Sequence, residues 1–393
     1  MADNSISVRL TGASVLRDGS FSRGPLSLRG GIVVDDSLPA VDLSGYMLLP
    51  GIIDLHGDAF ERHIAPRPSA PFDIETGLTA TDRDAAANGI TTAWLAQSWS
   101  WEGGKRGPDF AEEVLVALDA YRARALTDLR IQIRCETHTV DTLERLLDNV
   151  KRHAIDYVIF NNHLDEAHAL AKMDPETLAH WAKSAGKSPA EHLAAIESAK
   201  RQSAKVPRFL CSLSEAFDAL GVRYGSHDDA DGTVRETYAM IGARICEFPV
   251  SNSAAAVASA GGDPILMGAP NVVRGRSQAG NIAAIDLIRQ GRCDALVSDY
   301  YYPALSKAAF YLADTGLRTL PEAWAMVSEI PAKVMGLTDR GRIEPGLRAD
   351  FVIVDEATRS IEGTVSGGRI THLAGGAAQR FIAANPQLAI AAE

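Results

Sequence analysis

The segment Leu48-Leu-Pro-Gly-Ile-Ile-Asp-Leu-His-Gly-Asp58 is an apolar run that ends in two potential metal ligands, His56 and Asp58. Side chains two residues apart on a strand point the same way, so these two would face one cavity. The run from Met47 to Leu55 predicts a strand buried on both faces, and Gly57 would let the backbone approach an ion. A histidine and an aspartate at the C-terminal end of such a strand supply half of a metal site. The alternative is a core strand that runs into an ordinary polar loop. The residues at the ends of the other predicted strands distinguish between a metal site and such a loop.

Histidine and acidic residues also follow other predicted strands: Glu136 and His138 after 129–135, His163 after 157–160, His227 after 222–225, and Asp299 after 295–298. Imidazole mixed with carboxylates favours zinc, with manganese or iron as alternatives, over calcium or magnesium alone. Two divalent ions that share one carboxylate need about six ligands, and six candidates are present: His56, Asp58, Glu136, His163, His227 and Asp299. Glu136 is the predicted bridge, because no lysine stands at a strand end to form a carbamate. His138 is a weaker candidate, and solvated helix faces are predicted for His153, His168, His180 and His192.

Two neighbouring divalent ions lower the pKa of a shared water and polarise the bond to be broken, so the predicted chemistry is hydrolysis. Asp299, in Ser298-Asp-Tyr-Tyr-Tyr-Pro303, is the predicted general base, because a carboxylate within hydrogen-bond reach of that water can accept its proton. An aspartate that only caps the following turn is the alternative.

A run rich in glycine and arginine, Met267 to Asn281, follows another predicted strand and contains no acidic residue. Its backbone N–H groups, Arg274 and Arg276 would form a receptor for an oxyanion or a phosphate. Arg62 and Arg67 lie just beyond the first ligand pair in the sequence. Ordinary turn chemistry is the alternative for a glycine-rich loop, but its place beside a metal site favours an anionic, phosphorylated small-molecule substrate.

The elements that would position these residues alternate between strands and helices. Eight apolar strand candidates lie at 47–55, 90–95, 129–135, 157–160, 222–225, 243–248, 264–267 and 295–298, with amphipathic helical stretches between them. Eight such strands predict a (β/α)8 barrel over residues 49–340, whose C-terminal face would gather the ligands. The alternative, a doubly wound open sheet, usually carries a glycine-rich phosphate loop after its first strand. A surplus stretch at about 166–205 predicts two helices, either a lid or a solvated excursion.

Short strands with turn residues between them occupy the two ends of the chain. Residues 1–48 and 341–375 share this texture and predict one β-sandwich built from both ends. The tail, 376–393, is expected to add little to the core.

The chain has 393 residues and a formal net charge of -11, which argues against nucleic acid or an anionic membrane as a partner. No secretion signal or apolar run of membrane-spanning length is found, and the four cysteines form no C-x-x-C pair. A cytoplasmic protein is expected, and a homo-oligomer is compatible with the sequence.

Several of these stretches resemble the amidohydrolase superfamily, whose members carry a metal-binding barrel and a small β-sandwich made from both chain ends. Two stretches resemble the boundary motifs of that superfamily: Pro50-Gly-Ile-Ile-Asp-Leu-His56 and Gly346-Leu-Arg-Ala-Asp-Phe-Val-Ile353. A set of further stretches resembles its phosphonate-utilisation branch: His56-Gly-Asp-Ala-Phe-Glu-Arg-His63, Pro66-Arg-Pro68, Arg134-Cys-Glu136, Ser226-His-Asp-Asp-Ala230, Glu247-Phe-Pro249, Leu266 to Gly275, and Ser298-Asp-Tyr-Tyr301.

The resemblance implies hydrolysis of α-D-ribose 1-methylphosphonate 5-triphosphate to the 5-phosphate and diphosphate. It implies that the same six residues hold the metals and that Asn271, Arg274 and Arg67 face the phosphates. The chain departs from that branch at two positions, with Gln278 where histidine is expected and Arg276 where glycine is expected, so the substrate can differ while the metal chemistry is kept. Two other functions fit the same residues: an amide or cyclic-amide hydrolase or deaminase acting on a phosphorylated metabolite, and a non-catalytic, metal-stabilised subunit.

Overall fold

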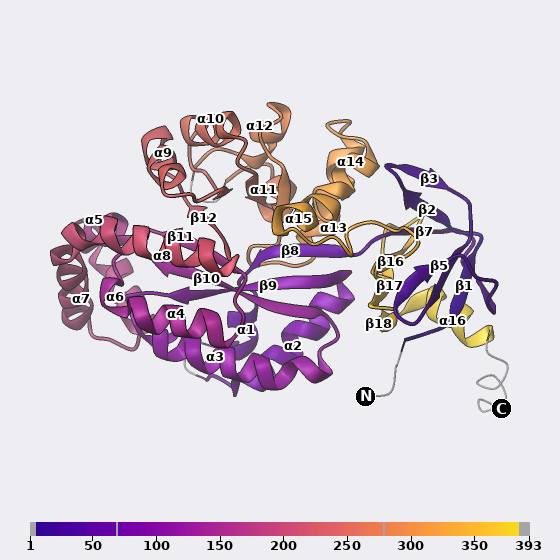
Figure 1. The fold of residues 1–393 in the computed structure, drawn as a ribbon, viewed down its shortest axis with the longest axis horizontal. Coiled ribbons are helices and arrows are strands. Elements are labelled where there is room, and N and C mark those ends of the chain that lie inside the picture. The colour runs from indigo at the N-terminus through magenta and orange to yellow at the C-terminus, as the bar shows by residue number, and fades with distance from the viewer. Residues whose placement is uncertain (1–4, 68–69, 278–279, 385–393) are drawn as a thin grey trace.

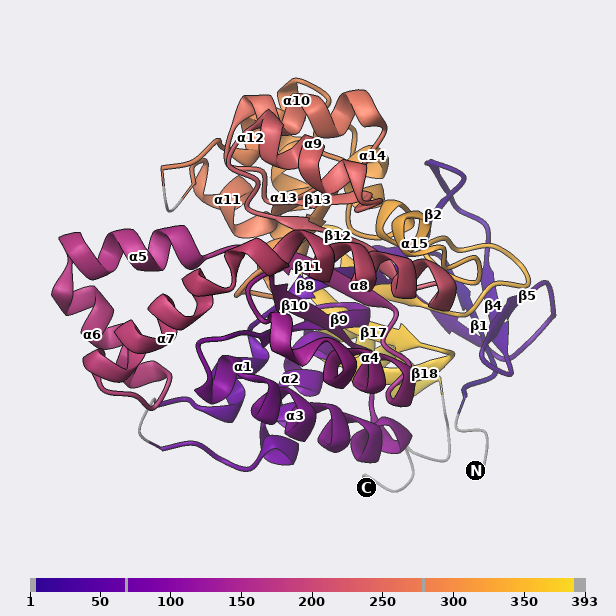
Figure 2. The same ribbon diagram turned by 60° about the vertical axis from the view of Figure 1, so that its left-hand side comes forward.

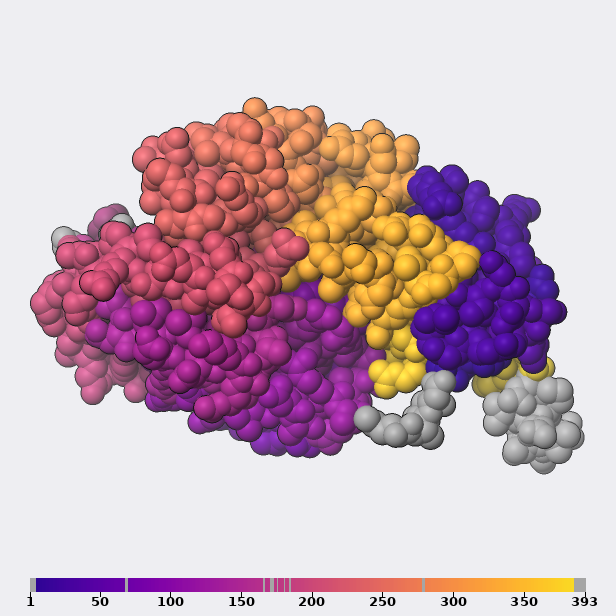
Figure 3. Space-filling view, viewed as in Figure 1, coloured from indigo at the N-terminus to yellow at the C-terminus, as the bar shows by residue number. Residues whose placement is uncertain are grey.

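The computed structural model describes residues 5–67, 70–277 and 280–384, apart from several side chains between 165 and 184. It shows two lobes, a large α/β lobe and a smaller β-rich lobe that contains both ends of the described chain (Figures 1 and 3). No helix in these three ranges is long and apolar enough to cross a membrane. The four cysteines are free, and Cys211 is exposed whereas the other three are buried.

The large lobe is a (β/α)8 barrel, as the strand count predicts. Within the described ranges its sheet has eight strands, each hydrogen-bonded in parallel to the next in chain order. The first strand meets the end of the last through a backbone bridge between Gly57 and Asp299. The strands are β8 (Ile52–Gly57), β9 (Ile90–Trp99), β10 (Asp128–Glu136), β11 (Tyr157–Asn161), β12 (Arg223–His227), β13 (Ile245–Glu247), β14 (Ile265–Gly268) and β15 (Ala295–Val297).

Helices cover the outside of this barrel (Figure 2). Strand residues that face outward join the helices in one large hydrophobic core. Inward-facing residues form a second core that also includes Ala332 and Met335, and this closes the end of the barrel where the strands begin. The covering helices are α1 (Phe60–Ile64), α2 (Ile74–Ala87), α3 (Pro108–Tyr121), α4 (Leu143–Arg152), α8 (Val206–Leu220), α9 (Gly232–Met240), α10 (Asn252–Gly261), α11 (Ala269–Arg274), α12 (Ala284–Arg289), α13 (Ala304–Asp314), α14 (Leu320–Ala325) and α15 (Glu329–Met335).

The surplus stretch after β11 forms three helices rather than the two that were predicted. They are α5 (Leu164–Met173), α6 (Pro175–Ser184) and α7 (Pro189–Arg201). Two of these helices begin with an N-terminal cap: Asp174 caps α6, and Ser188 forms a capping box with Glu191 at α7. The three helices pack on one another around their own small core, at the end of the molecule remote from the β-rich lobe (Figures 1 and 2).

The β-rich lobe contains two sheets, one formed by N-terminal strands alone and one that combines strands from both chain ends. One comprises β1 (Val8–Thr11), β4 (Leu26–Arg29), β5 (Ile32–Val34) and β6 (Ala40–Asp42). The other joins β2 (Ser14–Arg17), β3 (Ser20–Ser22) and β7 (Tyr46–Pro50) to β16 (Phe351–Asp355), β17 (Ile361–Ser366) and β18 (Arg369–Leu373). A shared hydrophobic core lies between the sheets. The predicted domain limits at 48/49 and 340/341 stay a prediction.

The single strand predicted from Met47 to Leu55 is in fact two strands. The break falls at Gly51, with β7 in the β-rich lobe and β8 in the barrel. A side chain at Gly51 would come within 2.4 Å of Thr91, so the chain passes closely between the two lobes here. One apolar run therefore serves two different sheets.

The C-terminal helix adds more to the core than the sequence predicts. α16 (Gly375–Ala383) buries Ala377 in the core of the β-rich lobe, and Phe381 packs against that core. The backbone N–H of Ala377 donates to Glu362 at 2.9 Å, and Arg380 donates to the backbone of Asp42 and Ser44. Of the predicted tail, residues 385–393 lie outside the described part.

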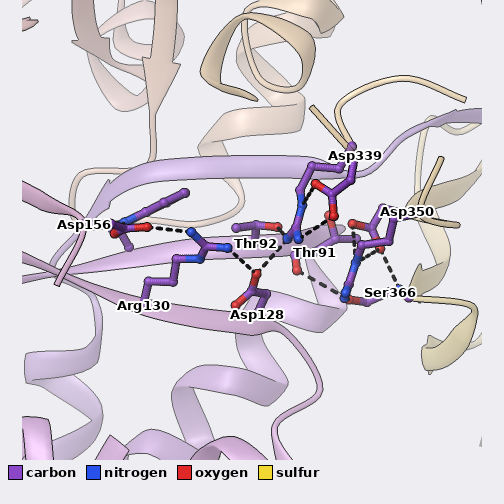
Figure 4. Close-up of polar contacts among 12 residues, drawn as sticks. Thr91, Thr92, Asp128, Arg130, Asp156, Asp339, Asp350 and Ser366 are labelled. Carbon is purple, nitrogen blue, oxygen red and sulfur yellow. Dashed lines mark hydrogen bonds and ion pairs between the residues drawn. The ribbon is translucent and has the colours of Figure 1, made fainter. Parts of the chain in front are cut away.

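A chain of ion pairs runs along the start of the barrel strands toward the β-rich lobe (Figure 4). Arg130 pairs with Asp156 and Asp128, and Arg340 pairs with Asp128 and Asp339. Nearer the β-rich lobe, Arg348 pairs with Asp350 and donates to Ser366. Because the beginnings of β9 and β10 face that lobe, the C-terminal ends of the strands open on the side of the helical insertion.

Candidate metal centre and active site

Three potential ligands converge at the C-terminal mouth of the barrel. His56 is the last residue but one of β8, His227 ends β12 and Glu247 ends β13. One ligand atom from each lies within 4.8 Å of the others. The two imidazole rings are 5.2 Å apart, centroid to centroid, and the ring of Phe248 packs against both. The three residues thus form a compact, largely buried donor set of the kind that binds a divalent cation.

Glu247 fixes the orientation of His56. Nδ1 of His56 donates to Oε2 of Glu247 at 2.8 Å, while Gln132 Nε2, at 2.7 Å, and the hydroxyl of Tyr157 donate to Oε1. Burial opposes the charge on both partners, yet their mutual attraction keeps the pKa of Glu247 below its usual value and that of His56 above it. With Nδ1 engaged, Nε2 is the atom of His56 that remains for a metal.

A second donor group surrounds His163. Its Nδ1 hydrogen-bonds to Glu136, and its Nε2 lies 3.8 Å from Asp228. The same Asp228 oxygen is 2.9 Å from Nδ1 of His227, so Asp228 links the two donor groups. Burial alone would lower the pKa of His163, but Asp228 and Glu136 raise it to about 9. Asp228 and Glu136 thus favour a proton on the imidazole of His163, and a cation bound to that imidazole would displace the proton.

Asp58 and Asp299 meet where the barrel closes. The N–H of Asp58 donates to the carbonyl of Asp299 at 2.8 Å, and the N–H of Asp299 donates to the carbonyl of His56 at 3.0 Å. Burial, followed by the nearby charge of Asp58, raises the pKa of Asp299 to about 6. A carboxylate with such a pKa is suited to accept a proton near neutral pH.

Asp54 holds this closure together from behind the mouth. It is fully buried and accepts hydrogen bonds from the backbone N–H and the hydroxyl of Ser298. Its carboxylate occupies the space that a side chain at Gly57 would need, since an added Cβ would lie 2.8 Å from Asp54 and 2.9 Å from Ser298. Glycine is therefore required between the two ligands His56 and Asp58.

Backbone strain is concentrated at this mouth. Asp228, Phe248 and Asp299 each have a φ between 50° and 57°, a left-handed conformation that residues other than glycine rarely adopt. Each stands just after a barrel strand. Such conformations persist where the surroundings enforce them, and they gather at functional sites.

The residues at the mouth fit a divalent metal ion in two respects: the chemistry of their side chains, and a buried polar atom that lacks a hydrogen-bond partner. Oδ1 of the buried Asn161, which ends β11 at the mouth, makes no hydrogen bond within the described residues. Buried polar atoms normally have partners. Imidazole nitrogens and carboxylate oxygens near such an unsatisfied atom are the ligands that zinc, manganese or iron would require.

A pocket of about 160 Å³ adjoins the mouth on the side of β13 to β15. Asp228, Phe248 and Asp299 form its inner wall, and Asn271, Arg274 and Arg276 are among its outer lining. Tyr300 connects the arginines, because Arg62 donates to its carbonyl at 2.6 Å and Arg274 to its hydroxyl at 3.3 Å. Asn271 accepts a hydrogen bond from the N–H of Ala284 at 3.0 Å and so holds the loop to α12. The structure brings a cationic wall to the metal-ligand group.

Other predicted residues lie elsewhere. Arg67 is exposed, its backbone pairs with Ala70, and it is not among the described residues that line the pocket. Gln278 is outside the described residues. Nε2 of His138 lies 3.2 Å from the hydroxyl of Ser203, in the segment after α7. Two of the histidines predicted on solvated faces are buried: His153, paired with Asp119, and His192, beside Trp101. The side chain of His180 lies outside the described part.

The sequence reasoning assigned no role to Glu247, Asp228 or Asp54. Glu247 ends an apolar strand, as the assigned ligands do, so the same strand-end signal would have found it. Asp228 directly follows the predicted ligand His227, in the stretch Ser226-His-Asp-Asp-Ala230. The role of Asp54 could not be predicted from the sequence. It depends on the last barrel strand lying beside this acidic residue, which only the structure shows.

Comparison with known proteins shows the family of the chain. Over 325 residues the chain is 33% identical to α-D-ribose 1-methylphosphonate 5-triphosphate diphosphatase of Escherichia coli (strain K12), an alignment that covers 80% of this chain and 84% of that protein. Residues 303–372 match the model of the amidohydrolase family. The chain belongs to the amidohydrolase family. It is therefore a hydrolase, of a superfamily that generally binds divalent metals.

Solved amidohydrolase-type structures share the fold of this amidohydrolase. Dihydropyrimidinase from Brevibacillus agri NCHU1002 superimposes with a TM-score of 0.61 over 95% of this chain and 97% of that one, at 13% identity. N-acetylglucosamine-6-phosphate deacetylase from Pasteurella multocida gives a TM-score of 0.61 over 93% and 99%, at 12% identity. At such identities the likeness shows the architecture alone, a barrel with a sheet built from both termini.

Proposed function

We propose that this hydrolase cleaves α-D-ribose 1-methylphosphonate 5-triphosphate, or a closely similar sugar triphosphate of phosphonate catabolism, to the 5-phosphate and diphosphate. The observation that carries the proposal is the cationic pocket wall of Arg274 and Arg276, which opens directly onto the donor groups at the barrel mouth. A neutral amide would not need two guanidinium groups there, whereas a polyphosphate chain would. The E. coli relative supports the same class of substrate.

The proposed metal ligands are the six residues predicted from the sequence: His56, Asp58, Glu136, His163, His227 and Asp299. Glu247 is proposed to orient His56, since both of its oxygens are already engaged by donors. Two divalent ions, zinc in the first place and manganese or iron as alternatives, would acidify a water and polarise the phosphoryl oxygen when bound. We further propose a cytoplasmic location.

In the proposed reaction Asp299 accepts the proton of the attacking water, and the bond from the α-phosphorus to the bridging oxygen of the departing diphosphate breaks. Arg274 and Arg276, with Arg62 behind Tyr300, hold the departing diphosphate, whose negative charge grows as that bond breaks. Arg67, Asn271 and Gln278 remain proposed substrate contacts. Since Arg276 and Gln278 replace the expected glycine and histidine, the outer phosphates are where the substrate range is expected to differ.

The test is to incubate the metal-reconstituted protein with a panel of ribose 5-triphosphates and phosphorylated amides, and to follow the products by phosphorus NMR. Release of diphosphate from a triphosphate is the expected result. Turnover confined to amides, with ammonia or a free amine as product, would overturn the proposal and favour the amidase or deaminase alternative. Bound metal without turnover on either class would favour a non-catalytic subunit.

A further inference from the structure

Arg134 occupies a central position in the barrel mouth that the proposed mechanism does not use. It lies on β10 between Gln132 and Glu136, and alternate side chains of a strand point to the same face. Gln132 reaches Glu247, and Glu136 reaches His163, so this face of β10 is the one that points into the barrel. Arg134 therefore projects into the space between the two donor groups.

The charge of Arg134 is not balanced by any carboxylate among the side chains that the structure describes. Among the described residues no acidic group lies within ion-pair distance of its guanidinium, and its buried Nε makes no hydrogen bond. Arg130 on the same strand and face is different, because it pairs with Asp128 at 2.9 Å and Asp156 at 2.6 Å. The buried Arg235 is likewise paired, with Asp229 and Asp263.

The electrostatic influence of Arg134 nevertheless reaches the groups around the mouth: His56, His163, His227, Asp228 and Asp299. A guanidinium so close to proposed metal ligands would repel any cation held there. An inward-facing cation without a counter-charge is also unfavourable. Both costs disappear if an anion lies between Arg134 and the metal ions.

We propose that Arg134 is a substrate-binding residue that contacts the phosphoryl group under attack, from the side of the barrel opposite Arg274 and Arg276. This rests on the proposed function and deepens it. β10 is the third strand of the barrel and the pocket lies over the sixth to eighth, so a polyphosphate would extend across the mouth with a cation at each end. The arrangement selects an anionic reacting group over a neutral amide.

The test measures binding of inorganic tripolyphosphate by calorimetry to the metal-loaded wild type and to Arg134→Met, Arg134→Lys and Arg130→Lys. Arg130→Lys is the matched control, the same change on the same strand and face but in a residue with two acidic partners. Metal content by mass spectrometry and thermal melting accompany each measurement, and KM and kcat are determined for any substrate found.

A charge-assisted hydrogen bond predicts that Arg134→Met weakens tripolyphosphate binding about tenfold or more, and Arg134→Lys about threefold or more, at unchanged metal content. Arg130→Lys should stay within about twofold of the wild type. Binding of both Arg134 variants within about twofold of the wild type, or loss of metal from both, would overturn the proposal. If Arg134→Met does not fold, Arg134→Lys decides by the same criteria.

The proposed function can fail separately. The wild type could bind tripolyphosphate through Arg134 and yet release no diphosphate from any triphosphate. That result would support the anion site at Arg134 and contradict the proposed reaction.

Discussion

Nδ1 of His56 lies 2.8 Å from Oε2 of Glu247, although 191 residues separate the two in sequence. Parallel pairing of successive strands brings the first and sixth strands of the barrel together at one mouth, and Gln132 and Tyr157 hold the glutamate from the third and fourth. The ring of His56 is thus fixed before any metal arrives, with Nε2 as its remaining ligand atom.

Glu247→Gln is expected to weaken metal binding about tenfold to a hundredfold, because the amide cannot stabilise the His56 ring as a carboxylate does. Competition with a chromogenic chelator measures the change. Glu236→Gln, on the exposed face of α9, serves as the control. Equal affinity in Glu247→Gln and the wild type would show that Glu247 does not orient the ligand.

Asp299→Asn should reduce kcat by roughly a hundredfold to ten-thousandfold, since it removes the group proposed to accept the proton of the attacking water. The backbone bonds of residue 299 to β8 do not involve its side chain, so the melting temperature of the metal-free protein should change little. Asp286→Asn, on the surface of α12, is the matched control. Comparable rates in Asp299→Asn and the wild type would remove the assignment.

Removal of divalent metal by a chelator should abolish turnover and lower the melting temperature. The proposed ligands Asp58, Glu136 and Asp299 then lose the cation that compensates their negative charge. A ligand present at a hundredfold excess over its Kd stabilises a protein by about 2.7 kcal/mol. Re-addition of zinc or manganese should restore both properties. Full activity at less than about one-tenth of an ion per chain would exclude a metal-dependent reaction.

Asp128→Asn should destabilise the protein in a way that depends on pH. Burial opposes its charge, but Arg130 and Arg340 hold the pKa of Asp128 below its ordinary 3.8. Its contribution is therefore fully present above pH 3.8 and is lost as the pH falls through the lower pKa of the folded state.

Breaking this paired network should cost about 3 kcal/mol at pH 7, since two arginines lose a partner. Urea unfolding of the wild type and the variant at pH 7, 5 and 3.5 measures the difference. The stability difference should be the same at pH 7 and pH 5 and begin to shrink at pH 3.5, and a difference that widens as the pH falls would contradict an ionised, stabilising Asp128. Asp36→Asn, which breaks an exposed pair with Arg29, should show almost no effect at any pH.

The barrel could be predicted because the signals for it are local, whereas the six strand-end metal ligands stay a prediction. Apolar runs that end in His56, Glu136 or Asp299 indicate buried parallel strands, and parallel strands bring their C-terminal ends to one face. The bounds of elements that depend on tertiary contacts could not be predicted. Gly51 divides one apolar run between two sheets, and α16 is held by Glu362, which only folding brings close to it.

The sequence by itself determined which residue types end each strand, and so the chemistry of the mouth. The tertiary structure alone decided their partners: that Glu247 faces His56, that Asp228 lies between His163 and His227, and that Arg134 projects inward without an acidic partner among the described residues. The physical reason is that hydrophobic periodicity specifies where strands begin and end. Which side chains meet across a closed barrel depends on register and on the turns after each strand, and these are fixed only when the whole sheet closes.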